Sequence, residues 1–139
     1  MSGYLLDTNV VSEIFREAHD LQVRSFLAEQ EDLWLSVVAL HELEFGLNLL
    51  PRGRRREDLR TALSSYVEAY ADLILPVTRA EAEQAALLRV QAQRGGRVLH
   101  FSDALIAGTA IVHNLMLATR NVKDFAALDV DVVNPWELS

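Results

Sequence analysis

Short apolar runs alternate along this chain with longer stretches of helical periodicity. Neighbouring parallel strands need a crossover between them, usually a helix, so this alternation predicts a mostly parallel sheet with helices on both faces. The expected strands are Gly3–Leu6, Leu33–Val37, Leu73–Val77, Leu115–Ala118 and Val130–Val133. The expected helices are Val10–Arg16, Leu21–Glu29, Leu40–Leu50, Glu57–Tyr70, Arg79–Arg94 and Asp103–His113.

Length and composition predict a single domain over residues 1–139. The chain is long enough for one core, half of its residues are hydrophobic, and it has no internal repeat or linker. It has no cysteine, which excludes disulfides and thiolate metal sites and favours a reducing, cytoplasmic compartment. Met1 leads directly into the first strand, without a signal peptide, and the longest apolar run is too short to span a bilayer. We therefore expect a soluble cytoplasmic protein.

The charge pattern gives two indications about partners. A net charge of -7 argues against a protein that coats nucleic acid by bulk electrostatics. Five arginines nevertheless cluster between two expected helices, at Arg52, Arg54, Arg55, Arg56 and Arg60. Arginine suits bidentate phosphate contacts, but a run of charge is as often a solvated loop, and both interpretations stay open here.

The expected helix Arg79–Arg94 has recognisable signals at both ends. The segment Thr78–Glu81 has the pattern of a capping box, and Gly95-Gly96 is a typical helix stop. The helix that follows Asp103 is apolar on every face, which indicates that it is buried. Asp103 should therefore project from the end of a rigid central element.

Four carboxylates lie where an apolar run gives way to a polar turn, at Asp7, Glu42, Asp103 and Asp124. Acids that met at the ligand-binding edge of an α/β sheet would repel one another unless a cation neutralised them, and hard divalent cations prefer oxygen ligands. Each acid also has a structural interpretation. Asp103 after Ser102 suits a helix start, Glu42 could be a solvated edge residue, and Asp124 could cap a turn. Asp7 is the hardest to explain structurally, because it ends a strand expected to be buried.

Other chemistries do not match the spacing. His41-Glu42 begins like a zinc-protease helix, but the second histidine is missing. No serine occupies a G-x-S-x-G turn, and no glycine-rich phosphate loop is present. A phosphoaspartyl enzyme would usually carry a second acid where this chain has Asn9, which weakens a phosphatase interpretation without removing it.

The motifs carry more weight in combination than singly. In chain order they are Leu5-Leu6-Asp7-Thr8-Asn9, Leu35-Ser36-Val37-Val38 leading to Glu42-Leu43-Glu44-Phe45-Gly46, Ser102-Asp103, Leu117-Ala118-Thr119-Arg120-Asn121 running into Asp124-Phe125, and Val133-Asn134-Pro135-Trp136. This order and spacing, which extends over essentially the whole chain, resembles the PIN-domain ribonucleases, in particular the VapC and FitB-like toxins of toxin–antitoxin pairs.

The resemblance implies a three-layer α/β/α sandwich with a mostly parallel central sheet, and an acidic Mg²⁺ or Mn²⁺ site that hydrolyses RNA. It places Asp7, Glu42 and Asp103 in the catalytic metal site, with Asp124 as the fourth acid and Asn121 as the alternative at that position. Small polar residues would orient the carboxylates, namely Thr8, Asn9, Ser36, Thr119 and Asn121. The residues implied for RNA contact are Arg120, Arg54, Arg55 and Arg56. The chain departs from many relatives at Ala39, where they carry Thr or Ser.

The resemblance also implies partners. They are an RNA substrate, a VapB- or FitA-like antitoxin in a groove near the two helices that follow Glu42, and a second copy of the chain in a homodimer. Two other functions remain open at this point. The domain could act mainly as an antitoxin-bound corepressor with little turnover, or it could be a small metal-dependent phosphatase.

Overall fold

The centre of the molecule is a five-stranded parallel sheet. A computed structural model describes residues 2–16, 18 and 20–138. The strands are β1 (Tyr4–Leu6), β2 (Leu33–Ser36), β3 (Ile74–Leu75), β4 (Met116–Ala118) and β5 (Val132–Val133), in the order β3-β2-β1-β4-β5. Every pairing is parallel, so the predicted sheet is confirmed, and each of the five predicted strands is found, shorter than expected by one to three residues.

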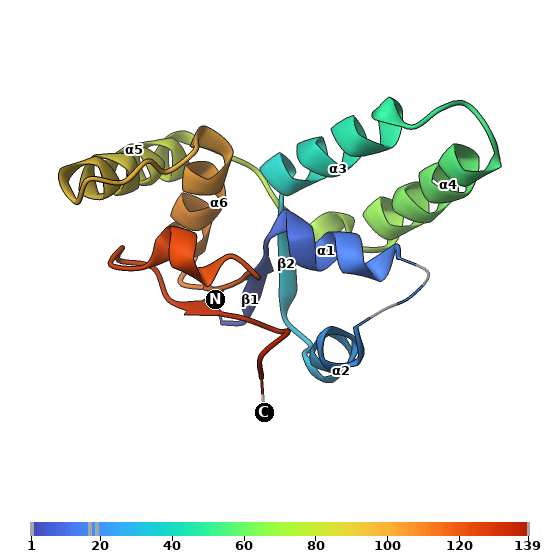
Figure 1. Ribbon diagram of the computed structural model, residues 1–139, viewed down its shortest axis with the longest axis horizontal. Helices are drawn as coiled ribbons and strands as arrows, with labels where there is room; N and C mark the ends of the chain where they lie inside the picture. The colour runs from blue at the N-terminus through green and yellow to red at the C-terminus, as the bar shows by residue number, and fades with distance from the viewer. Residues whose placement is uncertain (1, 17, 19, 139) are drawn as a thin grey trace.

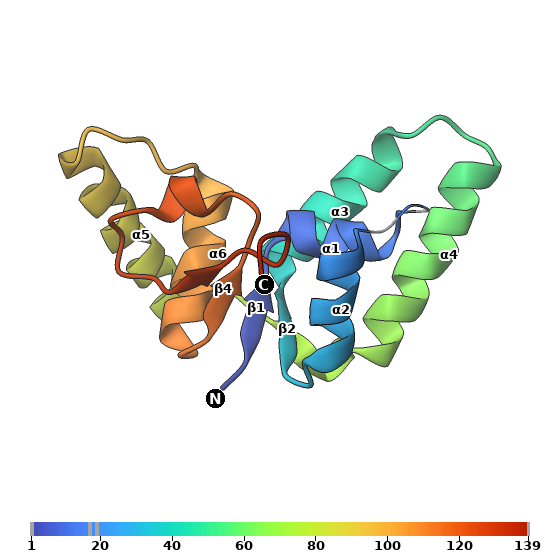
Figure 2. The ribbon, with the colours of Figure 1, turned by 60° about the horizontal axis from the view of Figure 1, so that its bottom comes forward.

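Six α-helices connect these strands. They are α1 (Thr8–Ile14), α2 (Leu21–Glu29), α3 (Val37–Leu49), α4 (Arg54–Ala69), α5 (Arg79–Arg94) and α6 (Phe101–Val112), with short 3₁₀ helices η1 (Ala71–Leu73) and η2 (Val122–Phe125). In Figure 1, α3 and α4 form an antiparallel pair beside α1. Figure 2 shows α5 and α6 on one side of the strands and α1, α2 and α4 on the other. Helices therefore flank the sheet on both sides, as the alternating pattern predicts.

The strand order creates a switch point between β1 and β4. From β1 the chain moves outward to β2 and β3, then returns across the sheet to β4 and β5. Crossovers that leave neighbouring strands in opposite directions open a crevice at the carboxyl ends of those strands, which is where open α/β sheets bind ligands. Asp7 directly follows β1 and Thr119 directly follows β4. Both residues therefore lie at this crevice.

Four helix starts differ from the sequence-based expectation. Helix α1 begins at Thr8 rather than Val10, because Asp7 caps it, and it ends at Ile14 rather than Arg16. Helix α3 begins at Val37, because the Ser36 hydroxyl accepts a hydrogen bond from the Val38 N–H at 3.1 Å and caps it. Helix α6 begins at Phe101 with His100 as its N-cap residue, so the assignment of Ser102 as the cap is wrong. Helix α4 begins at Arg54, so most of the arginine cluster lies on its first two turns rather than in a loop.

Helices α5 and α6 pack closely on each other. A Cβ atom at Gly108 of α6 would lie 2.9 Å from the Glu81 carbonyl oxygen and 2.9 Å from the Ala85 nitrogen of α5. The capping pattern at the start of α5 is used differently from the expectation: the Thr78 hydroxyl donates to the Glu81 carboxylate at 2.7 Å. Gly95 ends the helix as predicted. Within the described residues, no helix is both long and apolar enough to cross a membrane.

Candidate active site at the carboxyl ends of the central strands

Asp7 is the buried centre of the site. It ends β1, caps α1, and is only 5% exposed. One carboxylate oxygen accepts the Thr8 backbone N–H at 2.8 Å, and the other accepts the Thr119 hydroxyl at 2.8 Å. Burial raises the pKa of Asp7, and the nearby charges of Glu42 and Asp124 add to that rise, whereas the two hydrogen bonds oppose it.

Glu42 reaches the same place from α3. Its carboxylate accepts a 2.8 Å hydrogen bond from the Thr8 hydroxyl, so Thr8 holds Asp7 through its backbone and Glu42 through its side chain. Ser36, which is fully buried, fixes the start of α3 and therefore the position of Glu42 one and a half turns later. The predicted orienting roles of Thr8 and Ser36 thus correspond to specific contacts, and Ser36 supplies the cap that Ala39 lacks.

The segment after β4 completes the network around Asp7. The Thr119 hydroxyl donates to Asp7 and accepts the Asn121 backbone N–H at 3.1 Å. The Asn9 amide nitrogen lies 3.5 Å from Asp7, and its oxygen accepts the Arg120 backbone N–H at 3.3 Å. Asn121 thus takes part through its backbone.

Asp103 faces this network from the first turn of α6. Burial is the largest cause that raises its pKa to about 6, followed by the negative charges of Asp7, Glu42 and Asp124, while His100 lowers it. All four acids predicted from the sequence therefore share one electrostatic field. The fourth of them, Asp124, is exposed on η2, and its charge acts on both Asp7 and Asp103.

The acids suit a hard divalent cation by chemistry and charge. They are oxygen donors that repel one another in a half-buried crevice, which is the situation that such a cation relieves. The described part of the chain contains no three His, Cys, Asp or Glu side chains grouped closely enough to hold an ion as they stand. In this structure Asp7 and Glu42 are instead satisfied by threonine hydroxyls.

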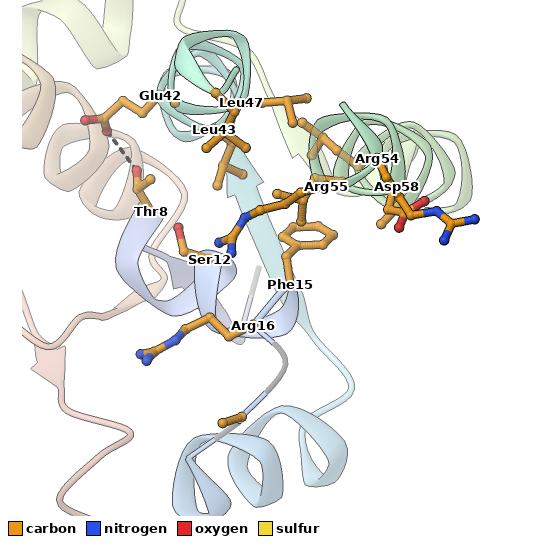
Figure 3. Close-up of a pocket in the computed structure, with 16 residues that line it drawn as sticks. Thr8, Ser12, Phe15, Arg16, Glu42, Leu43, Leu47, Arg54, Arg55 and Asp58 are labelled. Carbon is orange, nitrogen blue, oxygen red and sulfur yellow. Dashed lines mark hydrogen bonds between the residues drawn. The ribbon is translucent and has the colours of Figure 1, made fainter. Parts of the chain in front are cut away.

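The arginines predicted to contact RNA occupy different surroundings. The Arg120 guanidinium lies 4.9 Å from the centre of the Trp136 ring, and the Arg120 backbone adjoins the acid network through Asn9. Arg56 donates to the Asn48 side chain, and Arg60 pairs with Glu44 at 2.6 Å, so both connect α4 to α3. Arg55 extends back from α4 toward Ser12, whereas Arg54 points away (Figure 3).

A large groove opens next to Glu42, between α1, α3 and α4. Its volume is about 930 Å³. Thr8 and Glu42 lie at one end, and Arg55 crosses toward Ser12 (Figure 3). The wall between them is mainly apolar and includes Phe15, Leu43, Leu47, Leu50, Leu59 and Leu63. A partner groove near α3 and α4 was expected from the resemblance, but the contribution of α1 and the residue after it was not, because Ser12 and Phe15 belong to no motif.

Comparison with known proteins agrees with this geometry. The model of the PIN domain matches residues 4–131. The chain is 38% identical over 136 residues to VapC ribonuclease Y4jK of Sinorhizobium fredii, covering 96% of this chain and 97% of that protein. It is 38% identical over 135 residues to toxin FitB of Neisseria gonorrhoeae, covering 95% and 97%.

Two solved structures share this fold and are also similar to the chain in sequence. A crystal structure of FitAcB from Neisseria gonorrhoeae superposes with a TM-score of 0.91 at 37% identity, covering 97% of this chain and 99% of that one. A structure of FitAB bound to an IR36 DNA fragment superposes with a TM-score of 0.92 at 34% identity, covering 98% and 97%. The family model covers most of the chain, and the acids converge at the β1–β4 crevice. The chain therefore belongs to the PIN-domain family.

Proposed function

We propose that this protein is a Mg²⁺- or Mn²⁺-dependent endoribonuclease and the toxin of a toxin–antitoxin pair. The observation that carries this proposal is the convergence of Asp7, Glu42, Asp103 and Asp124 on one crevice, with the pKa of Asp103 raised by the other three acids as well as by burial. Relatives that align over almost the whole chain are named VapC ribonuclease and toxin FitB, which supports both parts of the proposal.

Asp7, Glu42 and Asp103 would hold the cation, with Asp124 at the open side of the site. A divalent cation there would lower the pKa of a bound water and stabilise negative charge on the attacked phosphate. The chain itself then has three tasks. Thr8 and Thr119 fix the carboxylates of Glu42 and Asp7, Asn9 joins the β1 and β4 ends, and the rim must hold an anionic backbone against the acids. Hydrolysis of this kind requires no nucleophilic side chain.

The groove between α1, α3 and α4 is the proposed seat of the antitoxin. Its mainly apolar wall suits an amphipathic helix, and it ends at Thr8 and Glu42, where a basic side chain of the partner would face the acids. Occupation of this groove would therefore also block the site. The FitAcB and FitAB structures, which are close in sequence and fold, support a complex of this kind.

The test is cleavage of total cellular RNA by the free full-length protein, with Mg²⁺, Mn²⁺ or EDTA. Wild type should give discrete fragments with a divalent cation and none with EDTA. Asp103→Asn should reduce the rate by at least about a hundredfold, since even residues that only support a metal ligand cost roughly 10–100-fold. Asp72→Asn, on an exposed carboxylate of η1, is the matched control and should cleave normally.

Two outcomes would contradict the proposal. Folded wild type that cleaves no RNA under any cation would favour the corepressor function. Turnover of p-nitrophenyl phosphate without RNA cleavage would favour the phosphatase.

A further inference from the structure

Arg120, which directly follows Thr119 of the acidic site, has its side chain over an aromatic ring. Its guanidinium carbon lies 4.9 Å from the centre of the Trp136 ring. Stacking of this kind uses the face of the guanidinium and leaves the N–H groups on its edge free to donate. Arg120 is exposed, and no carboxylate among the described residues forms an ion pair with it.

Both partners of the stack are held by the carboxyl edge of the sheet. The Arg120 backbone N–H donates to Asn9, whose amide lies next to Asp7. After β5, the backbone N–H of Trp136 donates to the Asn134 side-chain oxygen at 2.9 Å, in a turn that directly follows the strand. Because β4 and β5 are paired, the two side chains extend from neighbouring strand ends.

Arg120 directly follows Thr119, the residue that donates to Asp7, so its side chain starts at the rim of the acidic site. The acids repel any polyanion, and a cation at this rim offsets part of that repulsion for a phosphate that passes it. A guanidinium already held on an indole would lose little conformational entropy when it binds a phosphate. A free arginine side chain would lose more rotamer entropy in making the same contact. Trp136 would therefore raise the affinity of Arg120 without a contact of its own.

We propose that Arg120 binds a backbone phosphate of the RNA next to the scissile bond, and that Trp136 is the positioning residue that holds its guanidinium ready. This inference rests on the proposed function, because it takes RNA as the substrate. The competing explanation is that the stack only fastens the end of the chain, which is also tied to α2 by a hydrogen bond from Gln22 to the Leu138 carbonyl.

The experiment measures binding of the full-length protein to a fluorescein-labelled single-stranded RNA of mixed sequence, roughly 12 nucleotides long. Fluorescence anisotropy in EDTA, where metal-dependent cleavage is stopped, gives Kd over a series of salt concentrations. Arg120→Ala should raise Kd about tenfold and lower the slope of log Kd against log salt by about 0.7, the value for one phosphate contact on a single strand. Arg120→Lys, which keeps the charge but not the planar fork, should fall in between.

The role of Trp136 is tested by coupling. Trp136→Leu should raise Kd about threefold, and Trp136→Phe, which keeps an aromatic face, should restore most of the affinity. In an Arg120→Ala background Trp136→Leu should change nothing further, because the side chain that it positions is gone. Arg94→Ala, on an exposed arginine at the far end of α5, is the control and should bind like wild type.

Several results would overturn the inference. They are an unchanged salt slope in Arg120→Ala, additive effects of Arg120→Ala and Trp136→Leu, a lower Tm with unchanged Kd, or no RNA binding by wild type. The proposed ribonuclease activity fails separately: wild type that binds RNA in EDTA but never cleaves it with Mg²⁺ or Mn²⁺ would refute the nuclease and leave the phosphate contact standing.

Discussion

Asp103 shows how a single residue can couple stability to pH. Its carboxyl group has an ordinary pKa of 3.8 and a pKa of about 6 in the folded chain, because it is partly buried and faces Asp7, Glu42 and Asp124. Between these two values the folded chain binds more protons than the unfolded chain. The contribution of Asp103 to the free energy of unfolding of the metal-free protein should therefore fall as the pH rises from about 4 to about 6.

The measurement is urea denaturation in EDTA at a series of pH values, for wild type and Asp103→Asn. The difference in unfolding free energy between the two proteins should change in favour of the variant as the pH rises through this window. A difference that stays constant with pH would show that Asp103 does not titrate in this range. At pH 7, Mg²⁺ should raise the Tm of wild type more than that of the variant.

A second residue-scale prediction concerns the hydroxyl that holds Asp7. Thr119→Val keeps the shape of the side chain but removes the 2.8 Å hydrogen bond to the buried carboxylate. Because groups that orient a metal ligand typically contribute 10–100-fold to affinity, Mn²⁺ should bind about tenfold more weakly. Calorimetric titration measures this, with Thr61→Val on the exposed face of α4 as the control. Equal Kd values in the three proteins would remove Thr119 from the site.

The acids could be proposed from the sequence because Asp7 ends an apolar strand, Asp103 opens an apolar helix, and the motifs around Glu42 and Asp124 complete the family pattern. Their supports could not be derived in the same way. The hydrogen bond from Thr8 to Glu42 joins residues 34 apart, and that from Thr119 to Asp7 joins residues 112 apart. Such contacts depend on strand order, and no local pattern encodes strand order. Trp136 was visible in its Asn-Pro-Trp motif, but its stacking partner was not.

Among the secondary-structure elements, α2 and α5 were predicted with the bounds observed, whereas α1, α3, α4 and α6 begin two or three residues earlier than expected. The physical reason is the cap. Ser36, the last residue of β2, caps α3. Helix α4 starts directly after Gly53, whose φ of 155° is readily adopted by glycine. A helix extends past its outermost apolar residue until it reaches a cap. Apolar periodicity, which marks only the buried face, therefore underestimates the length of a helix.

The pair formed by α5 and α6 gives an element-scale prediction. Gly108→Ala would bring a methyl group to 2.9 Å from backbone atoms of Glu81 and Ala85, which cannot turn away. Overpacking of this kind should cost about 1–3 kcal/mol of the free energy of unfolding. The control is Gly46→Ala on α3, where nothing lies within 4 Å and the helix should gain up to about 1 kcal/mol. Chemical denaturation gives the free energy of unfolding of both variants. An unchanged value for Gly108→Ala would show that α5 and α6 can move apart without cost.

The whole molecule has a net charge of -7, yet α4 carries several arginines and forms one wall of a mainly apolar groove. The parallel sheet with helices on both sides was predictable from alternation alone. The groove was not, because its walls come from three helices that are distant in sequence. Its location beside Glu42 means that a partner bound there would lie over one end of the active site.

The groove can be tested without disturbing the core. Ala62 lines it and is exposed, so Ala62→Glu should leave the fold and the RNA cleavage of the free protein intact. A carboxylate in a mainly apolar groove should weaken binding of the cognate antitoxin at least about tenfold, since a buried unpaired charge is costly. Ala86→Glu, equally exposed but on α5, is the matched control. Calorimetric titration with the antitoxin gives both values, and equal affinities would place the antitoxin elsewhere.

The adjacency of β1 and β4 has a consequence during synthesis. Asp103, Thr119 and Asp124, which complete the surroundings of Asp7, are made more than 90 residues after it. A nascent chain on the ribosome therefore has no assembled acidic site until β4 and η2 have emerged and the sheet has closed. A ribonuclease that used this site, as proposed, would be inactive toward the RNA of its own ribosome until then.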